Sequence, residues 1–205
     1  MEMNLLRNGG PALVILVGLS ILAWGVVLER GWYWFQIVLS RDRRGILAAL
    51  DLIQGRRFKS AVRTLERIGR MPLARVLLQG VRRPGLEAAG RLEAAAIQEH
   101  RAMVTHTGIL DTVTASAPLV GILGTVMGII RSFNAFGGGG VPPPHLVIGG
   151  VSEALITTGA GLGVALASLV FASLLRGLAD RGAAELEQAV TQVEPILTRG
   201  TRHAD

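Results

Sequence analysis

Two long apolar stretches of this sequence contain polar side chains, and four of these are the residues best suited to chemistry. Thr125 lies in the first stretch, TASAPLVGILGTVMGIIRSF, while Glu153, Thr157 and Thr158 lie in the second, VIGGVSEALITTGAGLGVALASLVFASLL. A threonine hydroxyl both donates and accepts a hydrogen bond, so it can relay a proton or bind a cation through water, but it does not capture a proton by itself. If ions cross here, a second chain should bring the titrating carboxylate.

Glu153 is the least expected of the four. A charged side chain deep in a membrane span costs about 2.5–3.5 kcal/mol on insertion scales, so such residues usually face a cavity or a partner. Gly149 and Gly150 precede it, and they leave its depth in the membrane open. Two roles therefore remain open for Glu153. It is part of a gate or ion path, or it is a structural hydrogen-bonded group.

Small residues recur at intervals of three and four in both stretches, which places them on one face of each helix. Such faces allow close helix packing in membranes, and we assign this role to Gly121, Gly124, Gly128, Gly161 and Ala165. Pro118 stands inside the first stretch. It removes a backbone donor, frees a carbonyl and predicts a kink.

Each stretch is long enough to cross a bilayer, which needs about 20 mostly apolar residues, and a third apolar block begins near Pro11. An aromatic run, Trp32 to Phe35, follows that block as an interfacial belt would, so we interpret it as a retained transmembrane helix and not as a cleaved signal. The predicted fold class is an all-α membrane protein with three transmembrane helices, the second and third extended into the cytoplasm as long helices. The predicted segments are an external N-terminus (1–11), helix 1 (12–36), a cytoplasmic helical segment (37–105), helix 2 (106–136), an external Gly/Pro loop (137–148), helix 3 (149–175) and a cytoplasmic helical tail (176–205).

The segments outside the membrane also have helical periodicity. From Leu86 the sequence is rich in Ala and Glu, which predicts one helix running without a break from Leu86 into the second span, to about Phe136. The tail is predicted to be an amphipathic helix to about Val193, with Pro195 near its end.

Charge decides the orientation. Residues 41–105 hold 14 of the 21 basic residues, and the loop 137–147 has no Lys or Arg. The positive-inside rule then places the N-terminus and the loop outside and the C-terminus in the cytoplasm. The net charge of +6 is better explained by lipid headgroups beside the spans than by nucleic acid. The sequence has no Cys and no helically spaced His pair, so neither a disulfide nor a metal site is predicted.

The segments APLVGILGTVMGIIRSF (117–133) and GGVSEALITTGAGLGVALASLV (149–170) together resemble the MotA/TolQ/ExbB proton-channel family, and ExbB most of all. The Ala-Pro, Leu-Gly-Thr-Val and Glu-Ala-Leu-Ile elements stand in the family's order and separation. The middle segment is shorter than the large cytoplasmic domain of MotA. The resemblance implies a subunit of the bacterial inner membrane that couples the proton-motive force to mechanical work, here for TonB-dependent outer-membrane transport.

The resemblance also implies partners and roles. The family implies a homo-oligomer, typically a pentamer, around a single-span protein like ExbD or TolR that supplies a titrating Asp, with a TonB-like protein beyond it. It implies no cofactor other than the transported H⁺ or Na⁺. Thr125 and Thr158 would be pore-facing hydroxyls, and Glu153 the acidic residue near the outer mouth. This chain departs from many relatives at Ala167, where they have Pro, and at Arg131, where a neutral residue is common.

Three functions remain open at this point. The first is the ExbB-like stator, the second is a TolQ-like motor subunit for envelope maintenance, and the third is a membrane scaffold that conducts no ions. An enzyme is not expected, because the sequence has no recognisable nucleophile-base pair or phosphate loop. The segment FGGGG (136–140) has no following Lys and is interpreted as a flexible turn.

Overall fold

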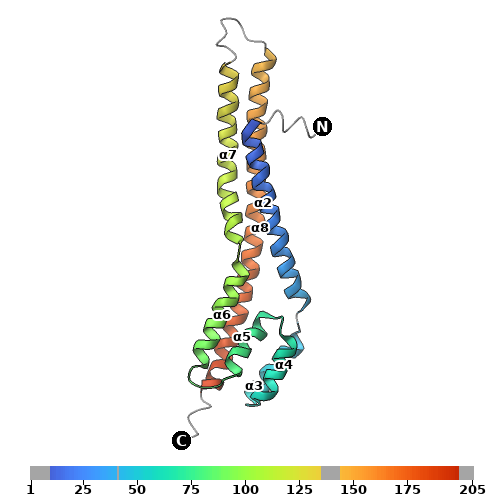
Figure 1. The fold of residues 1–205 in the computed structure, drawn as a ribbon, viewed down its shortest axis with the longest axis vertical. Helices are drawn as coiled ribbons and strands as arrows, with labels where there is room; N and C mark the ends of the chain where they lie inside the picture. The colour runs from blue at the N-terminus through green and yellow to red at the C-terminus, as the bar shows by residue number, and fades with distance from the viewer. Residues whose placement is uncertain (1–9, 41, 135–143, 199–205) are drawn as a thin grey trace. The chain divides into compact units, whose positions relative to one another are not determined.

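A computed structural model describes residues 10–40, 42–134 and 144–198. Within these ranges the regular elements are helices, α2 to α8 (Figure 1). Three stretches are long and apolar enough to cross a membrane, namely Gly10–Leu39, Ala88–Asn134 and Val147–Thr198. The predicted fold class is therefore confirmed, including the long helices at the second and third spans. The boundaries of the membrane along these helices stay predictions.

The chain divides into two compact units. The first comprises residues 1–29 and 106–174, and the second comprises residues 30–105 and 175–205. Two helices belong to both units: α2, Gly10–Leu39, and α8, Pro144–Thr198.

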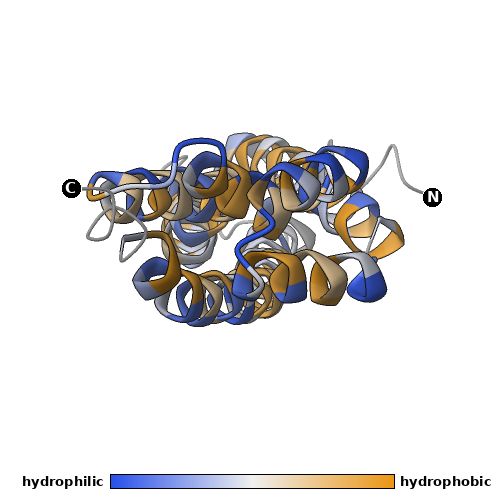
Figure 2. Cartoon of the chain, turned by 90° about the horizontal axis from the view of Figure 1, so that it is seen from below, coloured by the Kyte–Doolittle hydropathy of each residue, from blue (hydrophilic) through white to orange (hydrophobic). Residues whose placement is uncertain are grey.

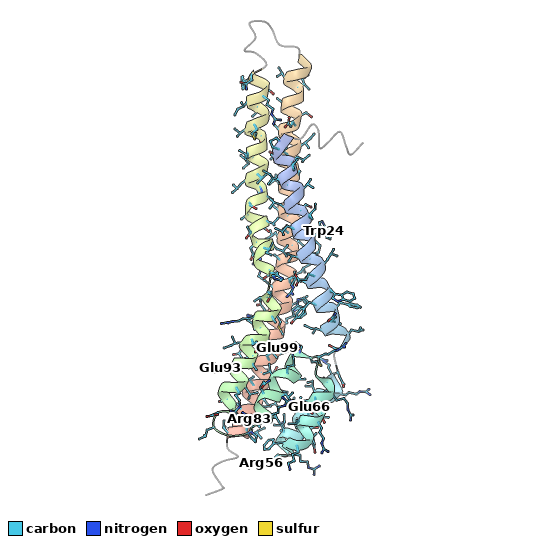
Figure 3. The ribbon with its side chains drawn as sticks, in the orientation of Figure 1. Trp24, Arg56, Glu66, Arg83, Glu93 and Glu99 are labelled. Atoms are coloured by element: carbon cyan, nitrogen blue, oxygen red, sulfur yellow. The ribbon has the colours of Figure 1, made fainter. Side chains whose placement is uncertain are left out.

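The first unit consists of the beginning of α2, the whole of α7 (Thr107–Asn134) and the beginning of α8. Trp24 of α2 packs against Phe171 of α8, with 5.7 Å between the ring centroids, and its position on α2 is labelled in Figure 3. The outward faces of these helices are apolar. Leu119 and Leu155, for example, are 66% and 67% exposed. Such faces suit lipid or other membrane helices.

The second unit contains α3 (Arg43–Gln54), α4 (Phe58–Ile68), α5 (Pro72–Val81) and α6 (Ala88–Val104), together with the ends of α2 and α8. Local signals set the helix starts. The Asp42 side chain accepts a hydrogen bond from the Gly45 amide at 3.0 Å and caps α3, and Pro72 occupies the first turn of α5. The helices are amphipathic, because their buried residues are mostly apolar and recur at helical spacing. Figure 2 shows polar and apolar residues along the ribbons in blue and orange.

The apolar faces meet in one core, in which Ile53, Leu65, Leu77, Leu92 and Leu197 have no exposed surface. Charged side chains pair on the outside. Arg75 meets Glu99 at 2.6 Å, and Arg82 meets Glu66 at 2.9 Å, with both glutamates labelled in Figure 3. Exposed pairs of this kind contribute little to stability, so the core holds the second unit together.

The helix expected to run unbroken from Leu86 to Phe136 is interrupted. The first helix, α6, ends at Val104, and α7 begins at Thr107. Thr105 is extended and His106 is left-handed, with φ of 64°. No Gly or Pro marks this break in the sequence. Two side-chain contacts accompany it: the Thr105 hydroxyl donates to the Arg101 carbonyl at 2.8 Å, and the His106 ring lies 2.8 Å from the Glu29 carboxylate.

The third helix is longer at both ends than the sequence predicts. It begins at Pro144, so residues 144–148, expected in the outer loop, are helical, and it continues through Pro195 to Thr198. An interior proline removes one backbone donor and its ring crowds the carbonyl four residues earlier, yet the helix continues past it. The last turn still packs, because Leu197 is fully buried and its carbonyl accepts the Gly85 amide at 3.1 Å. The rest of the expected loop lies outside the described residues.

Leu92→Ala should destabilise the second unit strongly. Leu92 is fully buried, and a truncation of this kind costs about 2–5 kcal/mol because a cavity remains. Thermal unfolding of the detergent-solubilised protein measures the effect. Leu86→Ala is the matched control, because Leu86 is 77% exposed; equal losses in the two variants would contradict the assigned core.

Candidate functional site

The candidate site lies along the contact between α7 and α8, where glycines let the two backbones approach. A Cβ atom added to Gly161 would lie 2.6 Å from the Ala117 carbonyl oxygen and 3.1 Å from the Gly121 Cα. Both distances are shorter than ordinary van der Waals contacts. Because each close neighbour is backbone, it cannot move aside as a flexible side chain can. This part of the seam therefore requires glycine.

The seam continues toward the end of α7. A Cβ on Gly124 would lie 2.5 Å from the Thr157 hydroxyl oxygen, and one on Gly128 would lie 2.7 Å from the Gly150 carbonyl oxygen. Ala165, the fifth predicted packing residue, is 7% exposed on α8. The structure thus places all five predicted packing residues on buried positions of α7 and α8.

Thr125 and Thr158 face each other across this seam. Their hydroxyl oxygens are 2.7 Å apart, and both lie near the Gly121 carbonyl oxygen, at 3.1 Å from Thr125 and 3.2 Å from Thr158. The two residues lie 33 positions apart in the sequence, on different helices. The small residues along the seam make this contact possible, since a hydroxyl is too short to bridge helices held further apart.

The three oxygens can share protons in two ways. Each hydroxyl donates one proton, so two protons serve three contacts. In one arrangement Thr158 donates to Thr125, which donates to the Gly121 carbonyl; in the other, Thr125 donates to Thr158, which donates to the same carbonyl. Rotation of the two hydroxyls exchanges the arrangements without movement of a heavy atom. Such a pair is suited to passing a proton.

The hydroxyl pair lies at the edge of the seam and not in its centre. Thr125 and Thr158 are both half-buried, whereas the neighbouring Gly159 is exposed and Val126 is 48% exposed. A helix from another chain could therefore approach the pair from the outward side without disturbing the contact between α7 and α8.

Thr157 occupies a different environment. It has no exposed surface, and its hydroxyl lies 2.9 Å from the Ala154 carbonyl and 3.2 Å from the Glu153 carbonyl of its own helix. It also fills the space beside Gly124. The structure therefore places Thr157 between the helices and not beside the Thr125–Thr158 pair on the outward side.

Glu153 forms an ion pair with Arg131 of α7, at 2.5 Å between Oε1 and Nη1. The side chain of Glu153 is 14% exposed and that of Arg131 is 45% exposed. Arg131 departs from the neutral residue that is common in relatives, but its contact with Glu153 was not predicted from the sequence. A signal existed, because Arg131 and Glu153 are the only Asp, Glu, Lys or Arg residues from position 112 to position 175.

Pro118 lies inside α7 and is half-buried. It cannot donate to the carbonyl of Thr114, four residues earlier, as a helical amide would. The Thr114 hydroxyl donates to the Leu110 carbonyl at 2.8 Å. The kink predicted at Pro118 stays a prediction.

Comparison with known proteins gives this site a family context. Residues 56–188 match the model of the MotA/TolQ/ExbB proton channel family. The ExbB-like 3 protein of Synechocystis sp. is 33% identical over 196 residues, which cover 93% of this chain and 92% of that protein.

Two further relatives carry other names. The biopolymer transport protein ExbB of Pseudomonas putida is 28% identical over 203 residues, 93% of this chain and 61% of that protein. The Tol-Pal system protein TolQ of Haemophilus influenzae is 25% identical over 179 residues, 77% of this chain and 75% of that protein.

Gly161→Ala should weaken the contact between α7 and α8, because the new methyl group would meet the Ala117 carbonyl at 2.6 Å. Gly163→Ala is the matched control, since nothing lies within 4 Å of a Cβ there. Thermal unfolding in detergent measures both, and we expect a loss of about 1–3 kcal/mol for Gly161→Ala alone, as overpacking typically costs. A loss of the same size at Gly163 would contradict the assigned contact.

Proposed function

The chain belongs to the MotA/TolQ/ExbB proton channel family, and we propose that it is the stator subunit of an ion-powered motor in the bacterial inner membrane. The transported ion is H⁺ or Na⁺. One observation carries the proposal: the hydroxyl pair of Thr125 and Thr158, 2.7 Å apart, stands at the edge of a tightly packed membrane seam. It is the position at which this chain can pass a proton to or from a partner.

The pair needs a titrating group from elsewhere. A hydroxyl relays a proton but does not bind an additional one at neutral pH. Apart from Glu153, the sequence has no Asp or Glu from position 112 to position 179. We propose that a single-span partner of the ExbD or TolR type supplies an Asp opposite the pair. A proton moving down the membrane potential releases about 2.3 kcal/mol per 100 mV, and this energy drives relative motion of the two subunit types.

The outward faces of the helices support assembly into a homo-oligomer, for which we propose a pentamer. Val126, Leu155 and Leu162 stay 48%, 67% and 55% exposed in the single chain, and they flank the hydroxyl pair along α7 and α8. In the assembly these faces would surround the partner helix. The basic second unit would then lie in the cytoplasm, with the N-terminus outside.

The names of the relatives support two candidate tasks for the motor. Two relatives named for ExbB cover 93% of this chain, which favours TonB-dependent transport across an outer membrane, with a TonB-like protein as a further partner. The match to a Tol-Pal system protein supports envelope maintenance as the second candidate. Deletion of the gene separates them, because the first predicts loss of energised uptake and the second predicts sensitivity of the envelope to detergent.

Thr158→Ala and Thr125→Val should each abolish energised transport, because either change removes one of the two relaying hydroxyls. Thr158→Ser keeps a hydroxyl and should keep transport. Proton flux into vesicles that contain the full complex measures the effect, normalised to the amount of assembled oligomer.

Thr112→Val is the matched control. Thr112 is an exposed α7 threonine whose hydroxyl donates to the Gly108 carbonyl at 3.0 Å, so its loss should leave flux unchanged. Normal flux in both Thr125→Val and Thr158→Ala, with the oligomer intact, would refute the ion path and favour a scaffold that conducts no ions.

A further inference from the structure

The ion pair between Arg131 and Glu153 joins the ends of α7 and α8 that lead to the Gly/Pro loop. Their contact is 2.5 Å, and the glutamate side chain is only 14% exposed. A third helix covers the pair. A Cβ on Gly10, at the start of α2, would collide with the Glu153 carboxylate and lie 2.8 Å from the Arg131 Nη1. Gly10 has φ of 59°, a conformation that favours glycine.

The charges are matched within these spans. From position 112 to position 175 the sequence has one cation and one anion, Arg131 and Glu153, with His145 as the only other titratable side chain of the common types. The side chain of His145 lies outside the described residues. Each member of the pair therefore neutralises the other in surroundings that offer few alternative partners.

The pair is separate from the hydroxyl site along both helices. Glu153 precedes Thr158 by five residues and Arg131 follows Thr125 by six, which at 1.5 Å per residue is about 7.5 Å along α8 and about 9 Å along α7. Thr157, the polar residue between them on α8, has its hydroxyl on carbonyls of its own helix. The described residues thus offer no continuous line of hydroxyls from Glu153 to Thr158.

We propose that Arg131 is a positioning residue that keeps Glu153 in a lasting ion pair, and that this pair clamps the outer ends of α2, α7 and α8. The Glu153 carboxylate is then a structural anion and not a station of the ion path. A carrier carboxylate must be neutral during part of each cycle, and a neutral Glu153 would leave Arg131 without its counter-charge. The inference rests on the proposed function, because it decides where the path in that function runs.

A double-mutant cycle on the full complex tests the clamp. Glu153→Gln alone and Arg131→Gln alone each leave one charge unpaired, and should lower proton flux per assembled complex about tenfold, within the range seen for coupled pairs. The double variant Arg131→Gln/Glu153→Gln leaves no unpaired charge and should recover most of the flux and of the thermal stability. Arg131→Lys keeps the pair and should behave like the unmodified chain.

The outcomes separate the two roles of Glu153. A double variant as inactive as Glu153→Gln, although assembled, would overturn the proposal and make the carboxylate an ion-path station. So would normal flux in Arg131→Gln, because a clamp needs both charges. The proposed function fails by a different result, normal flux in both Thr125→Val and Thr158→Ala. In that case the thermal unfolding of the unmodified chain, the two single Gln variants and the double variant still decides whether the charges are coupled.

Discussion

Close approach of the α7 and α8 backbones is the constraint on which the first unit depends. Apolar side chains gain little by leaving lipid for each other, so membrane helices associate through fitted small residues and interhelical hydrogen bonds. Here Gly121 and Gly161 bring the backbones together, and a Cβ on either would press on backbone atoms of the other helix. The 2.7 Å contact between the Thr125 and Thr158 hydroxyls is possible only at that separation.

The same close packing determines which hydrogen-bond partner each polar group finds. In a dry seam each polar atom needs a partner, since an unsatisfied one costs several kcal/mol. The Thr157 hydroxyl uses a carbonyl of its own helix at 2.9 Å. The Ser132 hydroxyl lies 3.1 Å from the Gly128 carbonyl of its own helix and 3.3 Å from the Val147 carbonyl of α8, so neither hydroxyl needs a partner from outside the seam. Glu153 uses Arg131. The Thr125 and Thr158 hydroxyls differ, because they bond to each other in either direction and stay half-exposed at the edge. A polar side chain in the seam is therefore not enough to identify the site. The site is identified by the two hydroxyls that bond to each other across the helices.

The sequence was enough to predict the three spans and the small-residue faces, because periods of three and four residues report a helix face directly. The family resemblance also named Thr125 and Thr158, but the 2.7 Å contact between their hydroxyls is seen only in the fold. The sequence pattern did not predict the break at Thr105–His106, where no Gly or Pro interrupts the pattern and the accompanying contact is with Glu29, 77 residues away. The Arg131–Glu153 pair was missed for the same reason: its members lie 22 residues apart on two helices, and only the fold brings them together.

A relay without its own titrating group makes physical sense in a motor. If one chain held both the relay and the carrier carboxylate, protonation would change charge inside a single rigid seam, and no subunit would have to move. In the proposed motor the carboxylate is on a partner helix, so the charge of that helix would change as it met each hydroxyl pair. Its interaction energy with the surrounding subunits would then depend on rotational position. A rigid seam would serve this purpose well, because α7 and α8 lie so close that a Cβ added to Gly161 would lie 2.6 Å and 3.1 Å from backbone atoms of α7, and this packing holds the two hydroxyls in place.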